Sequence, residues 1–121
     1  MTAQYSFTLN QGTDLSVPFV LKNKDQTPVD LSGSKIAMQL RKFTSDSEAI
    51  DTLTTANDRI KIEPEKGRFV CIFPHENTEK YPVIDLVYDI ELVSSGGLIT
   101  RIVEGSITVI PEVTRCSAVT L

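Results

Sequence analysis

The chain has 121 residues, a net charge of −4 at pH 7 and a pI near 4.9, and 40% of its residues are hydrophobic. This length suits one domain with a core of its own. The acidic balance and the scattered Lys and Arg residues exclude the basic surface of a nucleic-acid-binding protein. No apolar run approaches the roughly 18 residues of a membrane-spanning helix. The first residues lack a basic stretch followed by an apolar run, so we expect synthesis in the cytoplasm without a secretory signal.

Two short strands are predicted near the N-terminus. Tyr5, Phe7 and Leu9 alternate with polar residues, which predicts a strand with these three side chains on one face. Alternating large apolar residues from Leu15 to Leu21 predict a second strand. Pro18 lies within it and cannot donate a backbone hydrogen bond, so we expect this strand at a sheet edge or with residue 18 turned outward.

The next segment mixes turn signals with strand signals. Pro, Asp and Gly punctuate residues 27–33, where Asp30 can accept hydrogen bonds from backbone amides two or three residues ahead. Alternation over Ile36–Leu40 predicts a third strand. The polar residues 43–57 predict a loop, with a short strand near Ile50–Thr54 because its threonines favour extended structure.

Residues 59–73 predict a hairpin whose loop begins with Pro64 and ends with Gly67. In that register two pairs face each other on one side of the hairpin: Ile62 with Phe69, and Ile60 with Cys71. Val70 and Ile72 make the other side of the returning strand apolar as well. We therefore expect an internal strand that is partly covered on both faces.

The longest pattern is an antiparallel hairpin over Val83–Ile110. Every second residue from Ile84 to Leu92 is large and apolar, and Ser94–Gly97 supplies residues that tolerate a tight reversal. A loop of even length there predicts three facing pairs: Leu92 with Ile99, Tyr88 with Val103, and Ile84 with Ile107. One helical turn near Asn77–Tyr81 is expected to lead into this hairpin from another sheet.

Together these elements predict an all-β fold with seven or eight short strands, regularly spaced turns and no strong amphipathic helix. This pattern is typical of an immunoglobulin-like antiparallel β-sandwich. We expect the sandwich to span residues 1–110. Residues 111–121 are expected to form a C-terminal tail or arm, because no other segment of the chain offers them a partner strand.

The sequence offers no catalytic constellation. The single imidazole, His75, falls in a predicted turn, and no nucleophile is held against it by any recognisable motif. Asp85 and Asp89 fall on a solvated strand face, whereas paired catalytic carboxylates need a cleft. Cys71 and Cys116 form no metal-binding or redox motif and are expected to be unpaired thiols. We therefore expect a protein that is not an enzyme and that binds no metal or other cofactor.

Six short motifs follow one another along most of the chain. They are Gly12–Asp14, Pro28–Gly33, Met38–Arg41, Gly67–Phe69, Thr78 and Tyr81 followed by Tyr88–Leu92, and the ending Gly105–Arg115. In this order they resemble a family of small virion proteins of tailed bacteriophages. The chain is similar to the N-terminal attachment domain of upper baseplate proteins and to free-standing tail and head accessory proteins. It departs from that family by continuing from Cys116 to Leu121.

The resemblance implies a non-catalytic structural component of a bacteriophage virion, in the tail, baseplate or neck. It implies docking on other phage virion proteins, in multiple copies per particle, after synthesis in the cytoplasm of the bacterial host. A capsid decoration protein is the alternative. A carbohydrate-binding module is a further one, for which an exposed aromatic platform would be diagnostic.

The two ends of the chain are the candidate interface with those partners. Free sheet edges and terminal arms bind other chains through backbone hydrogen bonds. We therefore expect the arm to become ordered against a neighbouring subunit. The candidate interface residues are Tyr5, Phe7, Leu9, Glu112, Val113, Arg115, Val119 and Leu121.

Overall fold

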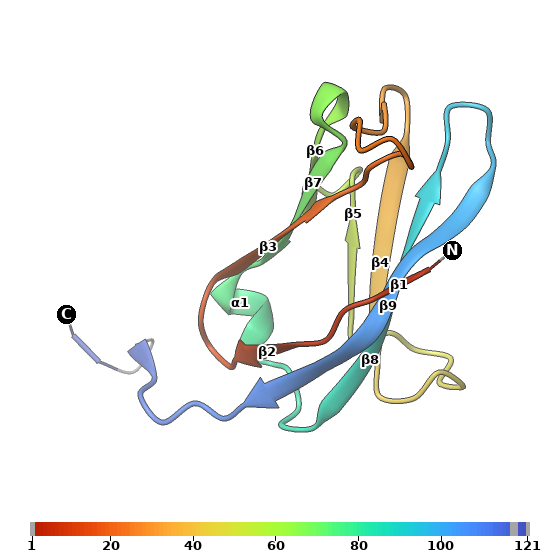
Figure 1. Cartoon of the computed structure of the whole chain (residues 1–121). Coiled ribbons are helices and arrows are strands. Elements are labelled where there is room, and N and C mark those ends of the chain that lie inside the picture. The colour runs from red at the N-terminus through yellow and green to blue at the C-terminus, as the bar shows by residue number, and fades with distance from the viewer. Residues whose placement is uncertain (1, 117–118, 121) are drawn as a thin grey trace.

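The chain folds into two facing β-sheets, which a computed structural model describes for residues 2–116 and 119–120. Sheet A has the order β1 (Ala3–Gln4), β9 (Ile99–Ile110), β8 (Asp85–Val93), β4 (Lys35–Arg41) and β5 (Asp51–Thr54), and β2 (Phe7–Asn10) also pairs with β9. Sheet B has the order β3 (Leu15–Val20), β7 (Arg68–Phe73) and β6 (Ile60–Glu63) (Figure 1). Two short helices, η1 (Pro64–Lys66) and α1 (His75–Thr78), complete the elements of the described residues. The predicted all-β sandwich is confirmed.

The first predicted strand is divided into two. β1 and β2 lie end to end along the same edge of β9, and the chain between them, Tyr5–Ser6, is not in strand conformation. Both run parallel to β9, which departs from the otherwise antiparallel pairing. The described residues therefore form nine strands where the sequence predicted seven or eight.

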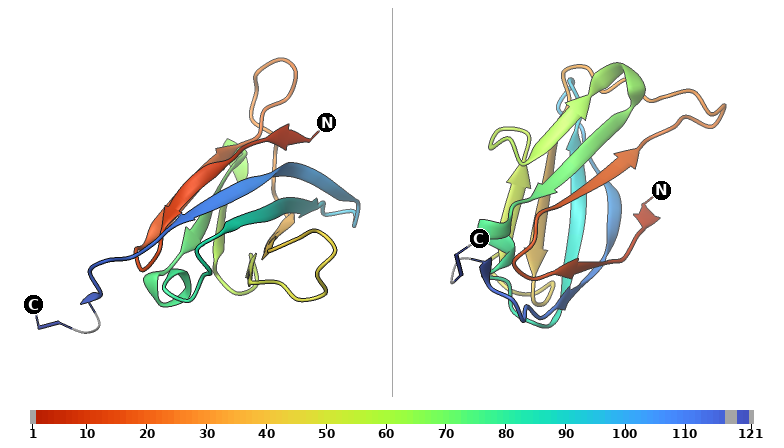
Figure 2. Two further views of the ribbon diagram at one scale, coloured as in Figure 1. Left: turned by 90° about the horizontal axis from the view of Figure 1, so that it is seen from below. Right: turned by 90° about the vertical axis from the view of Figure 1, so that its left-hand side faces the viewer.

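Alternating apolar side chains of both sheets point inward and form one core, which lies between the two layers (Figure 2). Each such side chain contributes about 1.5–3 kcal/mol when it is fully buried. The buried residues are Leu9, Val17, Leu31, Ile36, Met38, Leu40, Leu53, Ile60, Phe69, Cys71, Phe73, Tyr81, Leu86, Tyr88, Ile90, Val103, Ile107 and Val109.

The long hairpin forms, but its register differs from the predicted one. The strand starts at Asp85, and its loop has the odd length Ser94–Leu98 because Val93 pairs with Ile99. A β-bulge after Ile90 shifts the pairing by one further residue. The predicted pairs of Leu92 with Ile99, Tyr88 with Val103, and Ile84 with Ile107 are therefore wrong.

The inward faces of this hairpin were nevertheless predicted correctly beyond the bulge. Its two register errors add to a shift of two residues, and an even shift leaves the same side chains facing inward. Tyr88 lies opposite Gly105, and Leu86 lies opposite Ile107. Ile99, in contrast, lies at the tip of the hairpin with 62% of its surface exposed.

The second hairpin matches its prediction. Ile60 lies opposite Cys71 and Ile62 opposite Phe69, while Gly67 closes the loop at a φ of 61°. A side chain would be strained at that backbone angle. β3, which contains Pro18, is an edge strand of sheet B, as predicted.

Four local predictions have different outcomes. The short strand near Ile50–Thr54 is confirmed as β5, and the Asp30 carboxylate accepts a hydrogen bond from the Ser32 amide at 2.9 Å. The helical turn that crosses from sheet B to sheet A forms two residues before its predicted start. β7 is internal and partly buried on both faces, as predicted, since Val70 and Ile72 on its outer face are partly buried. No described helix or strand lies over that outer face (Figure 2). None of the described helices is long and apolar enough to span a membrane.

Candidate docking surfaces

The described residues of the C-terminal arm are Pro111–Cys116 and Val119–Thr120. The arm starts where the C-terminal ends of β2 and β9 lie together. Because these strands run parallel, Asn10 and Ile110 lie side by side. The Gln11 amide donates to the Ile110 carbonyl at 2.9 Å. The Gln11 side chain accepts from the Glu112 amide at 3.0 Å and donates to the Tyr81 carbonyl at 2.9 Å. Gln11 therefore fixes the root of the arm to two parts of the domain.

A glycine next to that glutamine leaves room for the arm. Gly12 has a φ of 79°, and a Cβ added to it would lie 1.8 Å from a carboxylate oxygen of Glu112. The backbone angle by itself disfavours a side chain at this position. The start of the arm is thus packed against the turn between β2 and β3.

Beyond its root the arm leaves the sandwich. Figure 1 shows the chain after β9 projecting away from both sheets. The arm residues from Val113 to Cys116 are exposed, and Val113 exposes 90% of its surface. Val119 is exposed as well. Large apolar side chains that a domain holds away from its own core are typical of surfaces that a partner covers.

The described residues of the predicted interface differ in exposure: one is buried, three are partly exposed and three are exposed. Leu9 is completely buried in the core, so its side chain is not a docking residue; its inward position on β2 is the reason. Phe7 is partly buried and contacts Tyr88 with ring centroids 5.7 Å apart. Tyr5 is half-exposed. The exposed group consists of Val113, Arg115 and Val119, and Glu112 is partly buried at the arm root; Leu121 lies outside the described residues.

A polar network stiffens the end of the sandwich from which the arm departs. Arg59 donates to the Asp51 carboxylate at 2.8 Å, and the Tyr81 hydroxyl donates to the same carboxylate. Burial by itself would raise the pKa of Asp51, but the hydrogen bonds from Arg59 and Tyr81 outweigh it and hold that pKa below its ordinary value. The Thr78 hydroxyl accepts from the Gly12 amide at 3.1 Å. This network joins sheet A, sheet B and the turn that holds the arm.

An imidazole and a carboxylate close the same end of sheet B. His75 follows β7, and its ring nitrogen Nδ1 lies 3.0 Å from the carboxylate of Asp14, which precedes β3. The hydrogen bond to Asp14, together with the charge of Glu76, raises the pKa of His75. Both side chains are at least half exposed, and the Asp14 carboxylate also accepts the His75 amide, which is a capping role.

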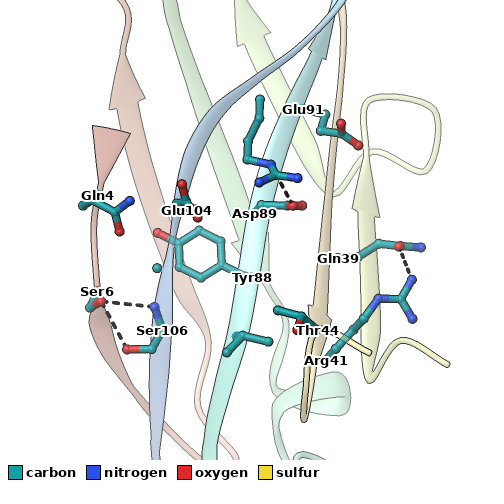
Figure 3. Close-up of a pocket in the computed structure, with 13 residues that line it drawn as sticks. Gln4, Ser6, Gln39, Arg41, Thr44, Tyr88, Asp89, Glu91, Glu104 and Ser106 are labelled. Atoms are coloured by element: carbon teal, nitrogen blue, oxygen red, sulfur yellow. Dashed lines mark hydrogen bonds and ion pairs between the residues drawn. The ribbon is translucent and has the colours of Figure 1, made fainter. Parts of the chain in front are cut away.

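The outer face of sheet A carries a shallow polar depression (Figure 3). Its polar groups are largely paired with one another. Arg101 lies 3.2 Å from Asp89, Arg41 donates to Gln39 at 2.6 Å, and Ser106 donates its amide to the hydroxyl of Ser6 at 3.1 Å. Tyr88 also borders the depression, but its ring is buried and offers no exposed aromatic platform.

The outer face of sheet B is apolar at its centre. Its residues are Ser16, Pro18 and Val20 of β3, Arg68, Val70 and Ile72 of β7, and Lys61 and Glu63 of β6. Pro18 lies directly opposite Val70. Val20 exposes 53% of its surface. An uncovered antiparallel sheet face is usually polar, so this composition favours a covered surface.

The two cysteines are free thiols in different surroundings. Cys71 is buried, which raises the pKa of its thiol to about 12, and Cys116 is exposed on the arm. Among the described residues there is no group of three or more His, Cys, Asp or Glu side chains that could hold a metal ion.

No protein-family model matches this chain, and the comparison with curated proteins gives no match either. Sequence reasoning located the arm but missed its anchor at Gln11 and Gly12. The signal was weak: a polar residue and a glycine in a turn are common, and only the parallel pairing of β2 with β9 brings them to the arm.

Proposed function

We propose that this chain is a non-catalytic structural component of a bacteriophage virion that acts by docking on other virion proteins. The observation that carries the proposal is the arm, whose root is fixed by Gln11 while Val113 is held almost fully in solvent. The ordered motifs from Gly12 to Arg115 that resemble tail and baseplate proteins support the same function. The tail, baseplate or neck is the proposed location.

An arm of this kind suits assembly because it costs the isolated domain little. Ordering a free segment costs about 1–2 kcal/mol per residue in backbone entropy, so it becomes ordered only when a neighbour offers enough contact. The buried core and the polar network at Asp51 stabilise the domain while the arm is unbound.

Termination of the chain after Glu112 tests this function. The shortened protein keeps the amide that Gln11 binds and loses Val113 and everything beyond it. We expect its free energy of unfolding to change by less than about 0.5 kcal/mol, as for other exposed residues. Its incorporation into particles, measured by mass spectrometry of purified virions, should fall strongly.

Full incorporation of the shortened chain would contradict the proposal, and so would absence of the complete chain from purified virions. The neighbouring genes give a quicker test, since a virion protein of this kind is expected beside genes for tail and portal proteins.

A further inference from the structure

The outer face of sheet B has the composition of a buried surface. Pro18, Val70 and Ile72 form its centre, and Val20 extends it along β3. Polar groups flank this centre: Ser16 lies opposite Ile72, Lys61 lies opposite Val70, and Arg68 pairs with Glu63.

The geometry favours docking on this face over addition of a strand at its edge. Pro18 has no backbone N–H, so the middle of β3 cannot offer a full set of donors to an added strand. The opposite edge, β6, is only four residues long. The apolar centre, in contrast, is continuous across β3 and β7.

The arm has the dimensions and pattern to cover that face. An extended segment rises about 3.3 Å per residue, so Pro111–Cys116 spans about 20 Å, whereas three strands are about 10 Å across. When the arm is extended, Val113 and Arg115 lie on one side of it. Val113 can then cover the apolar centre while Arg115 meets Glu63, whose side chain is 40% exposed at the rim.

The arm is poorly suited to cover its own domain. It leaves the sandwich after β9, as the left view in Figure 2 shows. Residues 112–116 contain no Gly, Asn, Asp or Pro, the residues that tight reversals favour. A second copy carries the same uncovered face and needs no such reversal.

We infer that the outer face of sheet B receives the C-terminal arm of a second copy of this chain. The inference rests on the proposed docking role of the arm and names its partner. Each copy offers an arm at one surface and a receiving face at another, so the contact joins two different surfaces. Such contacts close into rings or continue as open filaments, according to the rotation between copies.

Matched variants of the complete protein test this contact by sedimentation over a range of concentrations. Val70→Lys alters the centre of the sheet B face, and its control Val87→Lys makes the same change on the outer side of β8 in sheet A. Val113→Asp alters the arm, and its control Thr114→Asp puts the same charge on the next exposed residue. We expect concentration-dependent association in the unchanged protein and in both controls, and monomers for Val70→Lys and Val113→Asp.

A mixture of the two monomeric variants makes the test directional. The Val70→Lys protein retains an intact arm, and the Val113→Asp protein retains an intact face. The mixture should therefore form one-to-one complexes that grow no further. Mixing each of these variants with itself should give no complex.

Several results would overturn the inference. The unchanged protein could stay monomeric up to about 1 mM. Val70→Lys and Val87→Lys could reduce association equally, or the mixture of Val70→Lys and Val113→Asp could fail to associate. A loss of association in Leu98→Asp alone would move the receiving surface to the exposed tip of the β8–β9 hairpin. Particle incorporation tests the proposed function separately. Normal incorporation of Val70→Lys but not of Val113→Asp would keep the arm as a docking segment and exclude a second copy as its receiver.

Discussion

On the outer face of sheet A, Val87 is surrounded by polar side chains: Asp85, Asp89 and Glu91 of β8, Glu104, Ser106 and Thr108 of β9, and Gln39 and Arg41 of β4. On the outer face of sheet B, the corresponding central positions hold Pro18, Val70 and Ile72. Both sheets enclose the same core, so the core does not require this difference. It is explained if sheet A faces solvent and sheet B faces a partner.

The inner faces of the two sheets stabilise the domain, whereas the outer face of sheet B is available for docking. Side chains on the inner faces contribute to the free energy of folding. Side chains on the outer face of sheet B contribute little to it, because they pack against few atoms of their own domain. Substitutions on the two sides of one strand should therefore differ greatly in cost. Free energies of unfolding of such variants test this difference.

The largest expected effect comes from an aspartate placed on the inner side of sheet A. Leu86 is completely buried, so Leu86→Asp places a carboxylate in the core without a partner and should cost several kcal/mol, a large part of a domain's roughly 5–15 kcal/mol. Val70→Asp and Val87→Asp, on the outer faces, should each change stability by less than about 1 kcal/mol. Urea denaturation of the three variants checks the order. A cost for Val70→Asp equal to that for Leu86→Asp would make the outer face of sheet B part of the core.

A second prediction concerns the link between the two sheets. Asp51 belongs to β5 of sheet A, and Arg59 directly precedes β6 of sheet B. Their side chains are only 11% and 14% exposed, so Arg59→Ala leaves a nearly buried carboxylate without its cation and should cost about 3 kcal/mol. A double-mutant cycle with Asp51→Asn measures the coupling. Additive effects of the two substitutions would show that the pair does not hold the sheets together.

The sequence predicted most of this fold because its alternating residues define which side of each strand is buried. The pairs Ile60 with Cys71 and Ile62 with Phe69 were predicted correctly, since proline and glycine fix a short loop. The β8–β9 register was missed because a loop rich in Ser and Gly allows several lengths, and alternation carries no sign of a bulge.

The candidate site was less predictable than the fold. The exposed valine of the arm was identified from the sequence, whereas the side chain of Leu9 is buried because β2 turns it inward. The apolar composition of Val70 and Ile72 predicted partial cover of both faces of β7, and both side chains are partly buried. Composition indicates that a surface is covered and does not indicate by which molecule.

A third prediction tests how sheet A retains its N-terminal edge. A Cβ at Gly105 would lie 1.9 Å from the Tyr5 carbonyl oxygen, which also accepts the hydroxyl of Tyr88. Gly105→Ala must therefore displace the chain between β1 and β2 and should cost about 2 kcal/mol, as overpacking does. Gly96→Ala is the matched control, because the atom nearest to its added Cβ, the Ser94 hydroxyl oxygen, would lie 3.9 Å away. Thermal unfolding compares them, and equal stabilities would show that this edge contributes little to sheet A.

The smallest expected effect is a difference between the two sheets in how pH changes the stability that an ion pair contributes. The ion pair of His75 with Asp14 closes one end of sheet B, whereas the pair of Arg101 with Asp89 on sheet A contains no imidazole. The pKa of His75 is raised by its hydrogen bond to Asp14, and the pKa of Asp14 is lowered mainly by the amide of His75. A raised histidine pKa adds stability below its unfolded value and loses it as the pH rises through the folded value. A lowered aspartate pKa adds stability above its unfolded value and loses it as the pH falls through the folded one.

The contribution of the pair is therefore greatest between these two titrations. Asp14→Asn should lower the melting temperature slightly at about pH 5.5 and less at about pH 8.5, where the imidazole is neutral. Asp89→Asn should have the same effect at both pH values, because the guanidinium keeps its charge. Proton NMR titration of His75 provides the direct measurement, and its pKa should fall in Asp14→Asn. An unchanged histidine pKa in that variant would show that Asp14 caps the chain through the amide alone, and the pH dependence would then no longer distinguish sheet B from sheet A.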